Sequence, residues 1–88
     1  MDTVQGMNDG YFVVYPNPAS TNITVSRAKN STGDAWIQIF NLQGQAVTAN
    51  IQMNKSEKVI NVSKLPKGVY IVRIQAQNGI ETKKIVIR

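Results

Sequence analysis

Two apolar runs near the end of the chain decide its fold: Leu65-Pro66-Lys67-Gly68-Val69-Tyr70-Ile71-Val72-Arg73-Ile74 and Lys83-Lys84-Ile85-Val86-Ile87-Arg88, with Asn78-Gly79 between them. Asn-Gly between alternating apolar runs is the strongest short-range signal for a β-hairpin. Both residues tolerate the positive φ angles that a two-residue type I′ turn requires. The sequence therefore predicts that the chain closes with an antiparallel hairpin.

The turn also predicts the register of this hairpin. A two-residue loop at Asn78-Gly79 places Gln77 opposite Ile80, and counting outward places Arg73 opposite Lys84. Like charges directly opposite each other cost stability. We therefore expect this pair to lie in water or to bind an anionic partner, while the other face of the hairpin is apolar and looks into a core.

The residues that lead into the hairpin carry a second signal. Leu65-x-x-Gly68-x-Tyr70 looks like the tyrosine corner of immunoglobulin-type sandwiches, in which a tyrosine at a strand start bonds back to the backbone a few residues upstream. The cysteine that antibodies place two residues later would fall at Val72, and the chain has no cysteine. No inter-sheet disulfide is therefore expected.

Five further short segments have the composition or alternation of strands: 11–15, 22–26, 35–41, 45–51 and 59–62. Turn signals separate them, and no helical period occurs. Seven short strands of this kind predict an all-β, immunoglobulin-like sandwich of antiparallel strands with Greek-key connections over residues 11–88. Residues 1–10 are predicted to be a linker. The inward positions predict a core of Ile23, Val25, Ile37, Ile39, Ile60, Val62, Leu65, Tyr70, Val72, Ile74, Ile85 and Ile87.

The composition argues against catalysis. The chain has no histidine, which is the usual general base and the commonest metal ligand, and it has no cysteine. Its five carboxylates are scattered, and no glycine-rich phosphate loop or calcium or zinc spacing occurs. We expect neither enzyme activity nor a metal or cofactor. No apolar run is long enough for a transmembrane segment.

The net charge of +5 comes from the end of the chain. Residues 1–63 hold four basic and four acidic side chains, whereas residues 64–88 hold six basic ones and only Glu81. Such a charge run is often a solvated face. The alternative is a docking surface for an acidic partner, with a basic patch formed by Lys67, Arg73, Lys84 and Arg88.

Four motifs in fixed order resemble those of one protein family. They are Val14-Tyr15-Pro16-Asn17-Pro18, then Ile37-Gln38-Ile39-Phe40-Asn41-Leu42-Gln43-Gly44, and finally the two runs of the hairpin. Together they are similar to the C-terminal sorting domain of the bacterial type IX secretion system, in its type A form. The resemblance covers about residues 12–88. Each motif alone is weak, and their order and spacing make the match specific.

The resemblance implies a small immunoglobulin-like domain at the C-terminus of a larger exported protein of a Gram-negative bacterium of the Bacteroidetes type. In that family the cargo reaches the periplasm by the Sec route, and shuttle proteins and the outer-membrane translocon recognise the domain. A cell-surface cysteine-protease sortase usually then removes the domain, and the cargo is joined to anionic lipopolysaccharide or released. The cut falls just upstream of the sandwich, near residues 1–10.

The resemblance also assigns roles to residues of this chain. The sorting signal is expected at Lys83, Lys84, Ile85, Val86, Ile87 and Arg88. The other family-motif residues are Pro16, Asn17, Pro18, Gly44, Leu65, Gly68 and Tyr70. We further expect the last strand to have one free edge, which a receptor strand could join by β-augmentation.

Two other classes of function remain open on the sequence. One is a neutral or carbohydrate-binding immunoglobulin-like module of a surface protein, which should expose an aromatic strip. Tyr11, Tyr15, Trp36 and Phe40 are the candidates for such a strip, although aromatics in sandwich strands are more often core residues. The other class is a nucleic-acid binder. It would need aromatics interleaved with the basic residues, and only Tyr70, which is expected to face the core, is near them. We therefore expect no nucleic-acid partner.

Overall fold

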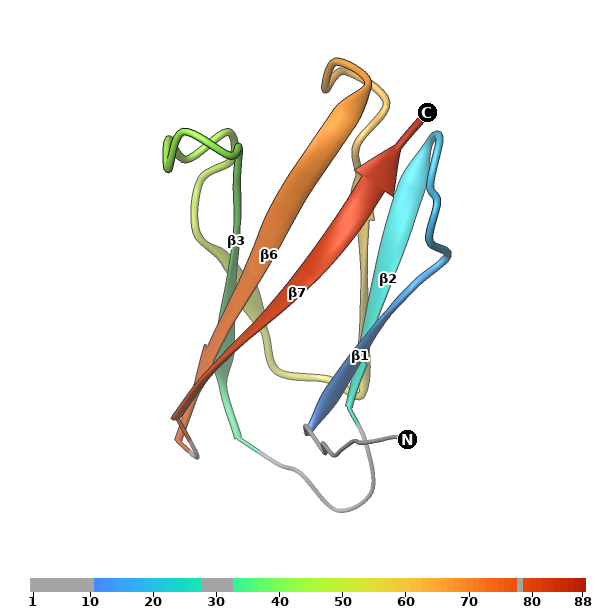
Figure 1. Ribbon diagram of the computed structural model, residues 1–88. Helices are drawn as coiled ribbons and strands as arrows, with labels where there is room; N and C mark the ends of the chain where they lie inside the picture. Colours follow the sequence, from blue (N-terminus) through green and yellow to red (C-terminus); the bar gives the residue numbers. More distant parts are fainter. Residues whose placement is uncertain (1–10, 28–32, 78) are drawn as a thin grey trace, which may run out of the picture.

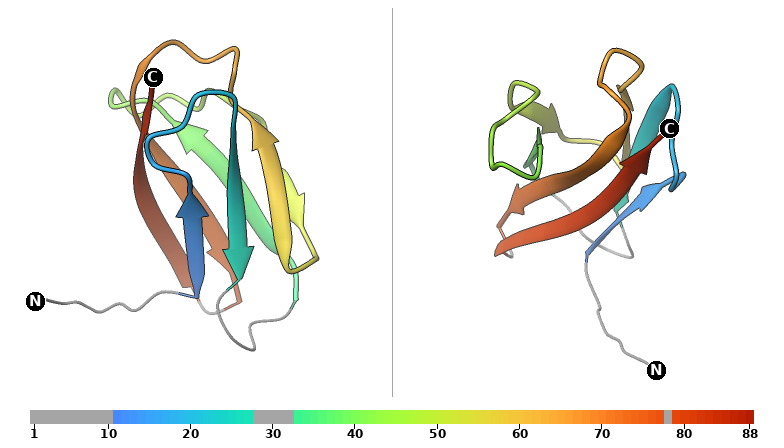
Figure 2. Two further views of the ribbon diagram at one scale, coloured as in Figure 1. Left: turned by 90° about the vertical axis from the view of Figure 1, so that its right-hand side faces the viewer. Right: turned by 45° about the horizontal axis from the view of Figure 1, so that its top comes forward.

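In the part of the chain that the structure describes, seven strands form two antiparallel sheets that face each other (Figure 1). The computed structural model describes residues 11–27, 33–77 and 79–88. One sheet has the order β1-β2-β5, and the other has the order β4-β3-β6-β7. The strands are β1 (Phe12–Tyr15), β2 (Asn22–Arg27), β3 (Ala35–Phe40), β4 (Ile51–Met53), β5 (Glu57–Asn61), β6 (Gly68–Ala76) and β7 (Gly79–Ile87). In the left view of Figure 2 the sheets lie one behind the other, which confirms the predicted β-sandwich.

The core lies between the two sheets and follows the predicted alternation. Every residue of the predicted core is buried except Leu65, which is half-buried and packs against the others. The prediction missed four members, namely Phe12, Ala19, Ala35 and Met53. Phe12 was missed because 11–15 is apolar throughout and gives no alternation, so its buried face could not be read from the sequence. The structure exposes Tyr11, Val13 and Tyr15 instead.

The strand predicted at 45–51 is wrong. Only Ala46 of this segment forms an isolated bridge, to Phe40, and β4 begins at Ile51. The segment nevertheless stays beside β3. Val47 N donates to the Ile39 carbonyl at 2.8 Å, but Ile39 N donates to the Thr48 hydroxyl oxygen at 3.1 Å. A side chain thus replaces a backbone acceptor, and the regular ladder ends there.

The hairpin β6–β7 forms as predicted, but its register differs by two residues. Ala76 pairs with Gly79, so Arg73 lies opposite Thr82 and Lys84 lies opposite Ile71. A two-residue shift keeps every side chain on its face, so the hydrophobic pattern cannot distinguish the two registers. The observed register avoids the like-charge pair and its cost. The predicted opposition of Arg73 and Lys84 is therefore wrong.

The tyrosine corner is present. The Tyr70 hydroxyl donates to the Pro66 carbonyl oxygen at 2.6 Å, and the ring is buried. Gly68, the first residue of β6, has φ of 154°. The bond therefore ties the loop before β6 to the strand itself.

The described residues contain no helix with the length and apolarity of a membrane span.

Replacing Tyr70 by phenylalanine tests the corner. The ring would still fill its place in the core, but the Pro66 carbonyl would lose its partner. We expect the free energy of unfolding to fall by about 1–3 kcal/mol, measured by urea denaturation monitored by circular dichroism. An unchanged midpoint would show that the bond contributes nothing to stability.

Candidate sorting-signal surface

The predicted signal, residues 83–88, does not present a single surface, because β7 alternates. Ile85 and Ile87 are buried in the core, with exposures of 1% and 3%. Lys84 and Arg88 are exposed, and Val86 is half-buried. Lys83 is half-buried, and its Nζ lies 3.7 Å from Glu81 Oε1. A partner that binds the folded domain therefore meets Lys84, Val86 and Arg88 rather than the whole motif.

The side chain of Asn17 binds the backbone of this strand on its outer edge. Val86 N donates to Asn17 Oδ1 at 2.9 Å, and Asn17 Nδ2 donates to the Lys84 carbonyl at 3.2 Å. One amide group thus satisfies a donor and an acceptor of an edge strand, as a neighbouring peptide group would. Asn17 lies between Pro16 and Pro18, and the peptide bonds before both prolines are cis.

Ala19 continues the same contact. Ala19 N donates to the Val86 carbonyl, and Arg88 N donates to the Ala19 carbonyl, both at 2.8 Å. The pairing of Ala19 with Ile87 is parallel. We call residues 17–19 the clamp. The prediction of a free edge is therefore wrong for the C-terminal part of β7. The described chain pairs no strand with its outer edge at residues 80–84.

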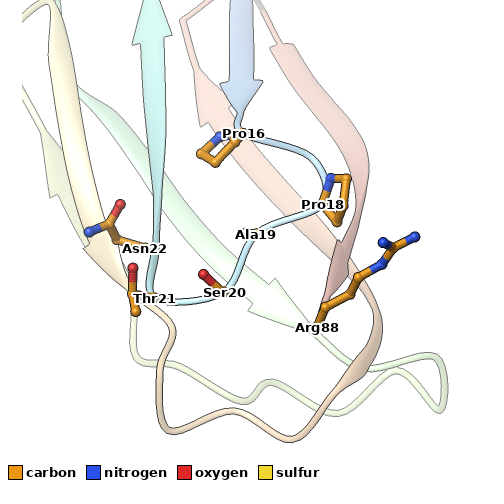
Figure 3. A pocket seen from close by; sticks show the side chains of 7 residues that line it. All are labelled: Pro16, Pro18, Ala19, Ser20, Thr21, Asn22 and Arg88. Carbon is orange, nitrogen blue, oxygen red and sulfur yellow. The ribbon is translucent and has the colours of Figure 1, made fainter.

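A shallow pocket opens where the clamp meets the end of the chain (Figure 3). Its volume is about 260 Å³. The Arg88 guanidinium lies on one side of the view, and the side chains of Thr21 and Asn22 lie on the other. The lining residues are Pro16, Pro18, Ala19, Ser20, Thr21, Asn22 and Arg88. Two motifs that are some 70 residues apart in the sequence, 16–18 and 83–88, thus form one surface.

The remaining family-motif residues lie away from this surface or beneath it. Leu65 packs against the core, and Tyr70 forms the corner. Gly68 pairs with Ile87. Gly44 has φ of 86° in the turn after β3, where Gly44 N donates to the Asn41 carbonyl. We infer that these four residues maintain the fold.

The four residues of the predicted basic patch do not form one cluster. Lys67 and Arg88 directly flank the pair Gly68–Ile87 at one end of the hairpin, whereas Arg73 lies in the middle of β6. The Arg73 guanidinium carbon lies 4.8 Å from the Phe40 ring centroid. Within residues 11–27, 33–77 and 79–88, none of the four cations pairs with a carboxylate.

Sequence reasoning did not find the role of Asn17 as a bridge to β7, since nothing local identifies the strand it would bind. The only available signal was an amide side chain held between two prolines. Ala19 gave no signal either. In the described part of the chain, no group of histidine, cysteine or carboxylate side chains is placed to hold a metal ion.

Comparison with known proteins assigns the chain to a family. The sequence model of the family described as "Secretion system C-terminal sorting domain" matches residues 13–88. No curated protein matches the chain. Sorting domains of this kind serve type IX secretion, which exports proteins toward the cell surface, and they are not a family of enzymes. Since the match spans the whole sandwich after Phe12, the chain belongs to the family of C-terminal sorting domains of type IX secretion.

Proposed function

We propose that this chain is the sorting signal of a larger cargo protein and that it directs this cargo from the periplasm across the outer membrane. The family match supports the class of function. The observation that supports the place of recognition is the clamp, because Asn17 brings the Pro16–Pro18 motif onto the terminal strand. The two motifs then act as one recognition surface.

The charged side chains and the pocket of this surface contribute to binding in different ways. Lys84 and Arg88 are exposed cations with no carboxylate partner among the described residues. Such charges steer an acidic partner and raise its association rate. The pocket beside Arg88 offers hydroxyl and proline side chains for close contact. We expect translocon and shuttle proteins to bind here through an acidic surface.

The proposal includes a later cut by a cell-surface cysteine-protease sortase. The described chain begins at Tyr11, directly before β1, and Phe12 is already part of the core. A cut within the sandwich would meet paired and buried backbone, so the proposal places the cut before Tyr11. The cargo would then be retained at the cell surface or released. The site itself falls in residues 1–10, outside the described residues.

The test is export of a fluorescent cargo that carries a Sec signal peptide and residues 1–88, in a bacterium with a working type IX system. We expect Lys84→Glu/Arg88→Glu to lower the initial rate of surface appearance at least about tenfold, since steering contributes roughly 10- to 1,000-fold to association rates. Cargo should accumulate in the periplasm. Both residues are exposed, so the domain should still fold, which circular dichroism would verify.

The matched control is Lys55→Glu/Lys58→Glu. It changes the net charge by the same amount as Lys84→Glu/Arg88→Glu. Both lysines are exposed, and they lie near the start of β5, more than 20 residues before β7 in the sequence. Normal export of this control together with failure of Lys84→Glu/Arg88→Glu supports the proposal. Normal export of both variants would place the signal elsewhere.

A further inference from the structure

The outer face of the second sheet carries the only tryptophan of the chain in an exposed position. Trp36 is 42% exposed on β3, although the sequence favoured a core position for it. The register places it between Gln52 on β4 and Gln75 on β6. Both glutamines are exposed. An indole is thus flanked by an amide on either side in one row across the sheet.

This row has the chemistry of a sugar-binding surface. An exposed indole face packs against the C–H groups of a pyranose ring, and each glutamine amide offers donors and an acceptor that match neighbouring hydroxyl groups. Among the described residues, neither glutamine side chain nor the Trp36 indole N–H makes a hydrogen bond. These groups are therefore available to a ligand.

The next row adds a cation. Arg73 pairs with Gln38 on β3 and is thus a diagonal neighbour of Trp36. Its guanidinium is held against the Phe40 ring, and its Nη2 donates to Gln38 Oε1 at 3.4 Å. Its remaining donors have no partner in the described part of the chain. Stacking fixes the guanidinium in place, so less rotational freedom is lost when it binds a carboxylate.

The charge of the whole face has one sign. The outward positions of β4, β3, β6 and β7 include Arg73 and Lys84 and no aspartate or glutamate; they are Gln52, Trp36, Gln38, Phe40, Val69, Ile71, Arg73, Gln75, Ile80, Thr82, Lys84 and Val86. Charge complementarity therefore favours an anionic ligand.

A pocket extends the surface beyond Arg73. It measures about 300 Å³ and is lined by Phe40, Asn41, Leu42, Gly44, Ile71, Arg73 and Thr82. Arg73 thus lies between the exposed indole and this pocket, which leaves room for more than one unit of a chain-like ligand. Concave apolar walls with a few polar groups are typical of ligand sites.

We propose that this face binds an anionic glycan whose sugars carry carboxylates. One pyranose ring stacks on Trp36, its hydroxyl groups bond to Gln52 and Gln75, and the carboxylate of that ring or its neighbour binds Arg73. Arginine pairs with a carboxylate through two parallel hydrogen bonds. The proposal does not depend on the sorting function, since its ligand contacts are Trp36, Gln52, Gln75 and Arg73 and it uses neither Asn17 nor Arg88.

The test titrates the folded 88-residue chain with oligogalacturonate, using the fully methyl-esterified oligosaccharide as the uncharged counterpart. Because Trp36 is the sole tryptophan, its fluorescence reports directly on the proposed site, and calorimetry gives the affinity. We expect a change in Trp36 emission and an affinity for the acid at least about tenfold above that for the ester, which is the effect of one charge-assisted hydrogen bond.

Two variants and two matched controls assign the binding to residues. Trp36→Ala should weaken binding of both oligosaccharides about tenfold, and Arg73→Gln should remove the preference for the acid. The controls are Tyr15→Ala, which removes a 45% exposed aromatic from the other sheet, and Lys58→Gln, which removes one exposed cation. Both controls should bind as the parent does.

Three results would overturn the proposal. The first is no binding of either oligosaccharide at millimolar concentration. The second is binding that Trp36→Ala leaves unchanged. The third is equal binding of an oligoglutamate peptide, which would make the face a surface for acidic peptides instead of glycans. Export of the variants is a separate readout, so failure here leaves the sorting proposal untouched.

Discussion

Replacing Ile39 by aspartate should unfold the domain. Ile39 lies on β3, one of the two inner strands of the second sheet, opposite Val72, and both side chains are fully buried. An unpaired carboxylate at this position costs several kcal/mol, or remains protonated at a similar cost. A domain of this size has a stability of roughly 4–13 kcal/mol. We expect the loss of the β-sheet signal in far-ultraviolet circular dichroism and of the cooperative thermal transition.

The control for this variant is Ile39→Val, which removes one methylene group. It should keep the fold and lower stability by only about 0.5–1.5 kcal/mol. A thermal midpoint of Ile39→Asp within a few degrees of the parent would mean that the side chain reaches water. The inward orientation of Ile39, toward the space between the two sheets, would then be wrong.

Deleting residues 84–88 should have the second-largest effect, and it acts on the fold before it acts on recognition. The deletion removes Ile85 and Ile87, and burial of each such side chain contributes about 1.5–3 kcal/mol. It also removes the four hydrogen bonds that Asn17 and Ala19 make to the strand, each with a net value of about 1 kcal/mol. The losses are comparable with the total stability of a small domain. We expect no cooperative unfolding transition in the truncated chain.

This expectation changes how a deletion is interpreted. Cargo with the truncated domain would fail to reach the surface even if residues 84–88 made no contact with the translocon. The charge variants at Lys84 and Arg88 are therefore needed to test recognition, because these side chains are exposed. A truncated chain that melts within a few degrees of the parent would show that the end of β7 contributes little to the core.

Periodicity was sufficient to predict most of the core. In β3, Ile37 and Ile39 alternate with Trp36 and Gln38, and the inward pair follows directly from a period of two. The same pattern was insufficient for the hairpin register, because a shift of two residues preserves it. It also failed at Phe12, whose neighbours are all apolar or aromatic.

The candidate surface was harder to predict than the core because it depends on contacts between distant residues. The sequence predicted that both the Pro16–Pro18 motif and residues 83–88 are functional motifs. Nothing local in the sequence, however, indicates that Asn17 binds the backbone of Val86. The alternation that places Ile37 and Ile39 inward also places Trp36 on the outer face of β3. Its exposure was nevertheless not expected, because aromatic residues in sandwich strands are more often core residues.

The clamp has a consequence for amide hydrogen exchange. Val86 and Arg88 N–H groups point away from β6, where an edge strand would normally leave them to water, but here they donate to Asn17 and Ala19. Exchange at these two amides therefore requires that residues 17–19 lift from the strand, and one such opening frees both donors and the carbonyls of Lys84 and Val86. A partner strand can pair along this part of β7 only after residues 17–19 have been displaced, and its binding free energy is reduced by the free energy of that opening. The protection factor of the Val86 amide therefore measures the free-energy cost of replacing the clamp by a partner strand at this edge.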